Sequence, residues 1–119
     1  MTKFNNTFEW DLKVGQIAEQ HLAAILEEAK IEVKRDMMAH RTGKVFVEYE
    51  CRFKPSGIAT STADFWAFVL NGQRIILIAS GDLKRLAREA VRNGKTAKGG
   101  DDKASLGALV KLEDLMVVR

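Results

Sequence analysis

Hydrophobic and polar residues alternate along two stretches of the chain, residues 30–36 and residues 45–53. Successive side chains of a β-strand point to opposite faces of the sheet, so each stretch is predicted to be a strand with one apolar and one charged face. If residues 37–44 turn the chain back, the two strands form a hairpin. The charged face of this predicted hairpin brings four residues close together, namely Lys34, Asp36, Glu48 and Glu50.

The rest of the pattern predicts a single mixed domain, residues 1–119. Apolar residues at helical spacing predict a helix from about Asp11 to Ala29, with His21 in its apolar stripe and Glu19 at the rim. The other predicted elements are a short buried helix over 63–70, a strand buried on both faces over 74–79, a basic helix over 81–93, a Gly-rich basic loop over 95–101, a strand over 106–110 and a turn or strand over 112–117. The order α-β-β-α-β-α-β predicts an α/β or α+β fold with a mixed central sheet flanked by helices.

Composition limits the class of protein. Cys51 is the only cysteine, which excludes an internal disulfide, and its place on the apolar face of a strand predicts a buried structural thiol. No apolar run approaches the roughly 20 residues needed to span a bilayer, and the first residues lack the apolar segment of a secretory signal. We therefore expect a soluble cytoplasmic protein with no membrane partner.

The positive charge of the chain is unevenly distributed. Residues 81–103 carry seven Lys or Arg against four Asp or Glu, although the net charge is only +3. A basic surface beside an acidic pocket suits a polyanion such as DNA, while a merely solvated helix face would give the same count. The candidate nucleic-acid contacts are Arg41 and Lys44 in the hairpin turn, Lys84, Arg88 and Arg92 on the basic helix, and Lys95 and Lys98 in the loop.

The charged face of the hairpin predicts a metal site. Carboxylates opposite one another in a sheet repel, so a face with Asp36, Glu48 and Glu50 favours a bound cation. Carboxylate oxygens suit Mg²⁺, which keeps positions for water and for a phosphate. Metal-assisted chemistry on a phosphate is therefore the first hypothesis for this face.

The acidic residues also resemble a known motif. Glu19 on the helix, Asp36 at the end of a strand and Glu48-Tyr49-Glu50 on the next strand resemble the core of the PD-(D/E)xK nuclease superfamily, which includes restriction endonucleases and Holliday-junction resolvases. The resemblance covers the order of elements over residues 15–79, and residues 42–58 are similar to small phage-type nucleases. It implies a restriction-endonuclease-like core and a Mg²⁺- or Mn²⁺-dependent endodeoxyribonuclease, of junction or repair type. Because a chain of 119 residues covers little duplex DNA, we expect a homodimer in which each subunit cuts one strand. The resemblance further implies that the metal ligands are Glu19, Asp36 and Glu48.

Two positions depart from the motif. Arg35 stands where the motif has a variable Pro. Glu50 stands where it has the Lys that positions or activates the attacking water, although some restriction enzymes of the superfamily use Glu there. Lys34, on the same predicted face, could supply the cation instead. The resemblance thus gives catalytic roles to both Glu50 and Lys34.

Two alternatives stay open beside this interpretation. Glu32-Val33-Lys34 is itself an ExK tripeptide, but this register needs an acid on an earlier strand, and Glu9 and Asp11 precede the long helix instead. We therefore prefer Asp36 and Glu48. The second alternative is a non-catalytic nucleic-acid-binding protein that keeps the nuclease fold and the basic surface without turnover.

Overall fold

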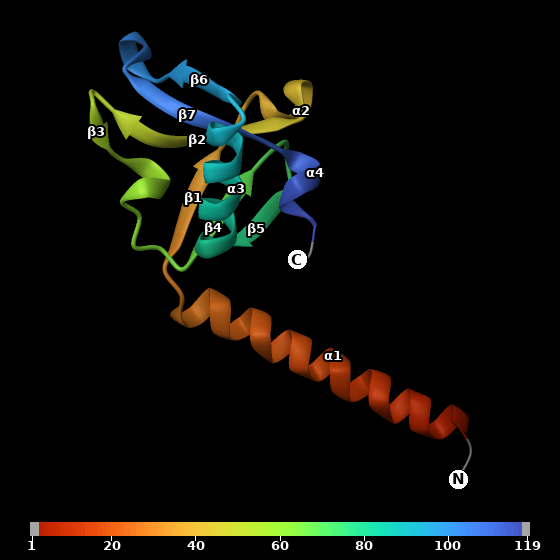
Figure 1. Cartoon of the computed structure of the whole chain (residues 1–119). Coiled ribbons are helices and arrows are strands. Elements are labelled where there is room, and N and C mark those ends of the chain that lie inside the picture. The colour runs from red at the N-terminus through yellow and green to blue at the C-terminus, as the bar shows by residue number, and fades with distance from the viewer. Residues whose placement is uncertain (1–2, 118–119) are drawn as a thin grey trace.

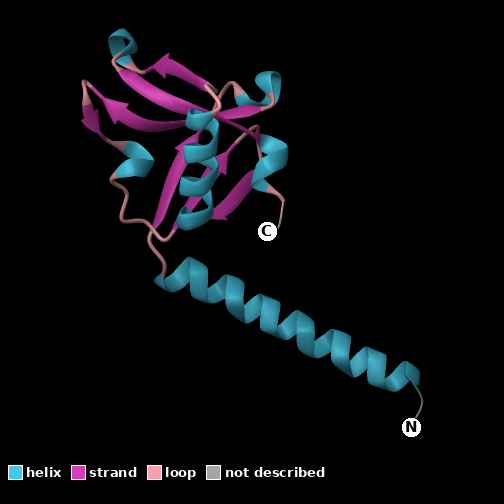
Figure 2. Cartoon of the chain, in the orientation of Figure 1, coloured by secondary structure: helices cyan, strands magenta, loops and turns pink. Residues whose placement is uncertain are grey.

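The computed structural model describes residues 3–117, and side chains from residue 7 onward. The fold is mixed α+β, with helices and two sheets (Figures 1 and 2). The helices are α1 (Lys3–Glu28), α2 (Ala39–Thr42), α3 (Ser80–Arg92) and α4 (Leu112–Leu115), with 3₁₀ turns η1 (Gly57–Ala59) and η2 (Asp101–Lys103). None of the helices within residues 3–117 combines the length and apolar character needed to cross a bilayer.

The strands divide between a mixed sheet and an antiparallel sheet. The mixed sheet has the order β1-β4-β5 and consists of β1 (Ile31–Arg35), β4 (Phe65–Val69) and β5 (Ile75–Ala79). In it β1 and β4 are parallel, and β4 and β5 are antiparallel. The antiparallel sheet has the order β3-β2-β7-β6 and consists of β2 (Lys44–Cys51), β3 (Lys54–Pro55), β6 (Thr96–Gly99) and β7 (Ser105–Lys111).

The predicted hairpin between residues 30–36 and 45–53 is wrong. Strand β1 pairs with β4 in the mixed sheet, whereas β2 pairs with β3 and β7 in the antiparallel sheet. The connection between β1 and β2 contains helix α2 instead of a tight turn. A short helix redirects the chain, so β2 joins the antiparallel sheet, where its longest pairing is with β7, much later in the sequence.

The predicted helix over residues 63–70 is also wrong, because this segment forms β4. Its aromatic and β-branched residues favour a strand, and the central place of β4 in the mixed sheet buries Trp66 and Phe68 almost completely. A dense apolar run has no period to separate a buried strand from a buried helix.

Three further expectations are corrected, and two are confirmed. The loop over residues 95–101 contains β6, which pairs with β7, and residues 112–115 form a short helix. The strand over 74–79 exists as β5, but it is an edge strand and is not buried on both faces. The basic helix and the strand over 106–110 are found as α3 and β7.

Helix α3 packs against both sheets and joins their apolar faces into one core (Figure 1). Its sequence alternates buried apolar and exposed charged positions at helical spacing, as predicted. The buried residues of the core include Leu83, Leu86 and Ala87 from α3, Trp66, Phe68 and Ile78 from the mixed sheet, and Val45, Val47, Ala108 and Val110 from the antiparallel sheet.

Helix α1 projects away from the rest of the molecule (Figure 1). The radius of gyration is 17.8 Å, against about 13.5 Å expected for a compact chain of this length. The apolar stripe predicted to face the core is therefore exposed, and so are His21, predicted as a core histidine, and Glu19. The exposed large apolar residues of α1 are Phe8, Trp10, Leu12, Val14, Ile17, Leu22 and Leu26.

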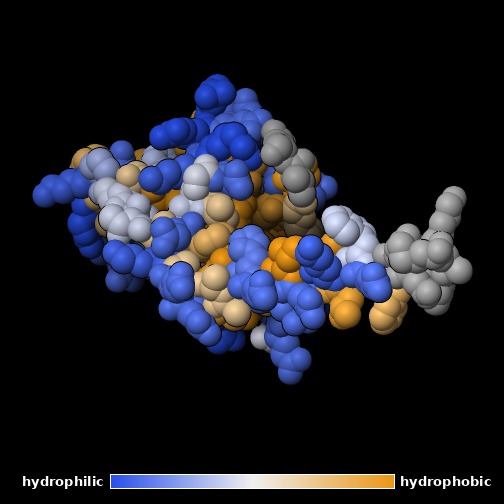
Figure 3. Space-filling model, turned by 90° about the horizontal axis from the view of Figure 1, so that it is seen from below, coloured by the Kyte–Doolittle hydropathy of each residue, from blue (hydrophilic) through white to orange (hydrophobic). Residues whose placement is uncertain are grey.

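One face of the mixed sheet is open as well. Trp66, Phe68 and Ile78 point toward α3, so the alternate positions form an outer face on the opposite side. Val33 is 61% exposed and Ile75 is 62% exposed on this face. Figure 3 shows hydrophobic residues at the surface of α1 and of the body near it. The apolar residues of the outer face are Ile31, Val33, Phe65, Ala67, Val69, Ile75, Leu77 and Ala79.

Candidate active site

Two adjoining cavities lie where β1 approaches β2 and η1. The first, called the β1–β2 cavity, has a volume of about 310 Å³. The second, called the η1 cavity, has a volume of about 560 Å³. Lys34 and Glu48 line both cavities, Asp36 lines the first and Glu32 lines the second. The cavities therefore bring together charged residues from β1, from the residue after it and from β2.

Asp36 connects the end of β1 to the next two elements. Its Oδ1 accepts hydrogen bonds from the backbone N–H groups of Met38 and Ala39, both at 2.9 Å, at the start of α2. Its Oδ2 accepts a hydrogen bond of 3.1 Å from the backbone N–H of Phe46 on β2. The carboxylate thus holds β1, α2 and β2 together, and Oδ2, which accepts one hydrogen bond, keeps a lone pair for a further ligand.

Glu48 is fixed by the segment that precedes η1. Its Oε2 accepts a hydrogen bond of 2.8 Å from the hydroxyl of Ser56, and the backbone N–H of Ser56 donates to the carbonyl of Tyr49 at 3.1 Å. Gly57 follows with a φ of +56°, and a Cβ at this position would collide with the carbonyl oxygen of Glu48. Only glycine allows this close approach of η1 to β2.

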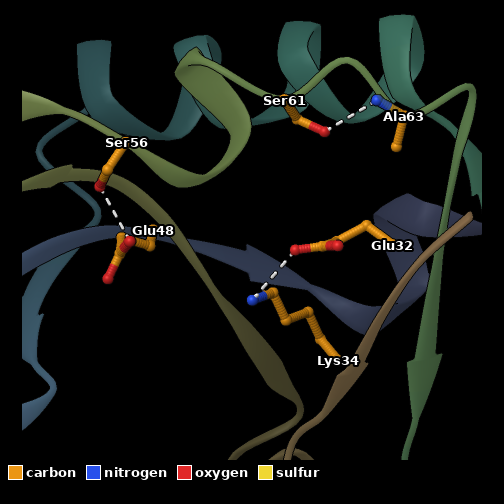
Figure 4. Close-up of polar contacts among 6 residues, drawn as sticks. All are labelled: Glu32, Lys34, Glu48, Ser56, Ser61 and Ala63. Carbon is orange, nitrogen blue, oxygen red and sulfur yellow. Dashed lines mark hydrogen bonds and ion pairs between the residues drawn. The ribbon is translucent and has the colours of Figure 1, made fainter.

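Lys34 is the cation that the two cavities share, although Lys30 also lines the η1 cavity and Arg35 the β1–β2 cavity. Its Nζ lies 3.3 Å from Oε1 of Glu32 and 5.8 Å from the centroid of the Trp66 ring. Figure 4 shows Glu32 and Lys34 extending from β1 toward the side on which Glu48 lies. Both members of the ion pair are about half exposed, so a charged ligand can compete with Glu32 for Lys34.

The structure does not place Glu50 with Glu48. Glu48 pairs with Gly107 and Glu50 pairs with Leu106, so β2 advances two positions while β7 advances one. Such a β-bulge changes the face to which the following side chains point. Glu50 therefore leaves the predicted charged face, and Cys51, predicted to be buried, is only partly buried.

The other predicted site residues lie apart from the two cavities. Glu19 is exposed on the projecting helix α1 and lines neither cavity. Of the basic residues, Lys84, Arg88 and Arg92 line a pocket beside η1, Lys44 and Lys95 line a second pocket, and Arg41 and Lys98 are exposed on α2 and β6.

Sequence reasoning did not identify Ser56 and Gly57 as parts of the site. Both lie within residues 42–58, which are similar to small phage-type nucleases, but neither is a predicted site residue, although a Gly after Pro-Ser signals a tight turn. Trp66 is not among the predicted site residues, because its segment is predicted to be a helix. The turn signal could have indicated the close approach to β2, whereas the hydroxyl of Ser56 carries no signal in the sequence.

The carboxylates fit part of a magnesium site. Within the described residues, no three His, Cys, Asp or Glu side chains are grouped closely enough to hold a metal. Asp36 and Glu48 form a pair at one cavity, and Mg²⁺ is commonly held by one or two carboxylates with water and phosphate completing its shell. Glu19 does not join this pair.

No protein-family model, curated protein or solved structure matches the chain, so its interpretation rests on these residues.

Proposed function

We propose that the protein is a metal-dependent endodeoxyribonuclease with a core of the PD-(D/E)xK type. The observation that supports this most is the shared β1–β2 cavity, where Asp36, Glu48 and Lys34 meet. Carboxylates that can hold a metal ion, with a cation beside them, are groups that suit metal-dependent phosphodiester hydrolysis. Nicking of plasmid DNA and cleavage of branched DNA, each with Mg²⁺ or Mn²⁺, test the proposal.

In this proposal, Asp36, Glu48 and Lys34 have different roles in the β1–β2 cavity. Asp36 and Glu48 would hold Mg²⁺ or Mn²⁺, which supplies a more acidic bound water and neutralises charge on the phosphate. Lys34 is better placed than Glu50 to orient a phosphate oxygen or the attacking water, because it lines the same cavity as both carboxylates. The Glu32–Lys34 ion pair would open when a phosphate arrives. Glu19 would reach the cavity only after a change in the position of α1.

The first prediction concerns metal and stability. Saturating Mg²⁺ or Mn²⁺ is expected to raise Tm, because an ion that binds only the folded state stabilises it. A tenfold excess over Kd contributes about 1.4 kcal/mol, which corresponds to a rise of a few degrees. Thermal unfolding measures the shift, and Glu48→Gln should remove it while Glu32→Gln should keep it. A Tm that does not change with either Mg²⁺ or Mn²⁺ would count against any metal site.

A non-catalytic nucleic-acid-binding protein is the second candidate. Two observations favour it: Lys34 already has a partner in Glu32, and both oxygens of Asp36 already accept backbone hydrogen bonds. The charges of Lys34 and Asp36 are therefore partly compensated by groups of the chain itself, without a metal ion. Such a protein should bind DNA equally well with EDTA and with Mg²⁺, whereas the nuclease should not.

The proposed enzyme works as a homodimer, with α1 of one copy covering the outer face of the mixed sheet of the other. Two open apolar surfaces in one chain support this, because large exposed apolar patches mark interaction sites. Charge supports it too. From residue 7 to residue 28 the helix carries five Asp or Glu and one Lys, while Lys30, Arg35 and Arg74 flank the outer face. Reciprocal contact of this kind closes into a symmetric pair.

The second prediction tests this dimer. The wild type is expected to sediment as a dimer at micromolar concentration, and Leu22→Gln with Leu26→Gln to weaken association at least about tenfold, since each buried Leu contributes roughly 1.5–3 kcal/mol. Gln16→Ser with Gln20→Ser, on the polar side of the same helix, is the matched control and should leave the dimer intact. A wild type that remains a monomer, with α1 folded onto its own sheet, would overturn the dimer.

A further inference from the structure

A pocket of about 400 Å³ lies between α3, η1 and β2, and it is called the α3 pocket. Its volume is in the range of small-ligand sites, which are mostly apolar with a few convergent polar groups. The residues that line it are Tyr49, Ile58, Ala59, Lys84, Ala87, Arg88, Val91 and Arg92. It is therefore a defined hollow, and the three cations of α3 are not simply a stripe on a flat helix surface.

The α3 pocket combines an apolar interior with a cationic rim. Tyr49, Ile58 and Val91 supply the apolar part, and none of the Asp or Glu residues between 7 and 117 lines the pocket. Its three cations, Lys84, Arg88 and Arg92, stand one helical turn apart along about 12 Å of α3. The ion pairs Glu32–Lys34, Asp82–Arg85 and Lys111–Glu113, within residues 7–117, do not include a cation of the pocket. A ligand with an apolar ring and negative charge matches this combination.

Strand β2 and η1 link the α3 pocket to the candidate active site. Glu48 lines the η1 cavity and its neighbour Tyr49 lines the α3 pocket, so the two side chains diverge. Likewise Gly57 lines the η1 cavity, whereas Ile58 and Ala59 line the pocket. One 3₁₀ turn thus forms the wall between a cavity with carboxylates and a pocket with cations.

We propose that the α3 pocket takes one unstacked base of a DNA strand, with the adjoining phosphates on Lys84, Arg88 and Arg92. The ring of Tyr49 offers a stacking surface, and base–aromatic stacking is a main source of affinity for single strands. A strand bound in this way would cross η1, which directs its next phosphate toward Lys34 and Glu48. The inference rests on the proposed nuclease for its biological sense, but binding of the base requires no metal.

The test compares a short single-stranded oligonucleotide with the same oligonucleotide carrying one abasic position, in EDTA, by fluorescence anisotropy. The wild type is expected to bind the intact strand roughly tenfold more tightly, as one stacked base predicts. Tyr49→Ala should abolish this preference. Because Tyr49 also packs against the core, Ala59→Leu, which narrows the pocket from an exposed position, gives an independent second variant with the same expected loss.

Substitutions on α3 test whether the cations of the pocket contribute to DNA binding. Arg88→Ala should weaken binding of both strands equally and reduce the slope of log K against log salt by about 0.7. Arg85→Ala is the matched control, because Arg85 is paired with Asp82 and does not line the pocket. Equal effects of the two variants would show that α3 attracts DNA only by its general charge, and would overturn the pocket.

Two further arms separate the outcomes. A mononucleotide that binds as tightly as the strand would assign the pocket to free nucleotides and overturn a DNA contact. Metal-dependent cleavage without any preference for the intact strand would reject the base pocket and leave the nuclease standing. A clear preference for the intact strand without cleavage in Mg²⁺ or Mn²⁺ would support the pocket and reject the nuclease.

Discussion

Glu48→Gln is expected to abolish DNA cleavage while the protein stays folded. The glutamine keeps an oxygen that can accept the hydrogen bond from Ser56, but it loses the negative charge at the β1–β2 cavity. Loss of a direct metal ligand should cost more than the roughly 10- to 100-fold that loss of an outer-shell partner costs. Plasmid nicking in Mg²⁺, with Tm measured on the same sample, checks both parts of the expectation.

Two other carboxylates serve as comparisons for this result. Glu32→Gln should keep cleavage, although Glu32 lines the neighbouring η1 cavity. Asp36→Asn should also abolish cleavage, but it replaces an acceptor by an N–H₂ group among three backbone donors and so costs about 1–3 kcal/mol of stability. It must therefore be assayed well below its own Tm. Full activity of Glu48→Gln, or loss only in Glu32→Gln, would move the site to the Glu32-Val33-Lys34 register.

Gly57→Ala is expected to destabilise the fold strongly. The backbone conformation at Gly57, with φ at +56°, is strained for alanine, and the new Cβ would also collide with the carbonyl oxygen of Glu48. The strain alone costs about 1–3 kcal/mol, and relief of the collision requires η1 to move away from β2. We therefore expect a loss of about 3 kcal/mol or more, measured by urea unfolding, together with loss of cleavage.

Gly72→Ala provides the matched control. Gly72 has a φ of +63°, but no heavy atom lies within 4 Å of a Cβ placed there. This variant carries the same backbone strain without the collision, so it should lose only about 1–3 kcal/mol and keep its activity. Equal losses in the two variants would mean that η1 yields easily and does not fix Glu48.

Local periodicity predicted the elements that have a regular amphipathic pattern. Helix α3 shows one clear period and is found where the pattern places it, whereas the apolar run over residues 106–110, found as β7, was predicted as a strand without such a period. The segment that forms β4 has no polar positions to reveal a period, so its state depended on its place at the centre of a sheet. The pairing of β1 with β4 depends on contacts far apart in sequence, which no local pattern encodes.

The sequence predicts that Asp36 and Glu48 lie close together, but it does not predict the contact that brings them there. Asp36 and Glu48 were expected to be close through a hairpin, and they do line one cavity. Their closeness comes from the hydrogen bond between Asp36 and the backbone of Phe46, across two sheets. The bulge after Glu48 could not be predicted, because an alternating sequence looks the same with or without an extra residue in one strand, and so Glu50 was misplaced.

The strand order of the antiparallel sheet also determines when the site can form. Val47 pairs with Ala108, so the main partner of β2 is about half the chain away. Contacts so distant in sequence form slowly, because a long loop must close, with a loss of entropy, before the strands can pair and stabilise it. During synthesis, the edge of β2 that pairs with β7 therefore stays unpaired until β7 has left the ribosome. Strands β1, β4 and β5 can assemble earlier. The cavity around Glu48 is accordingly among the last parts of the molecule to take shape.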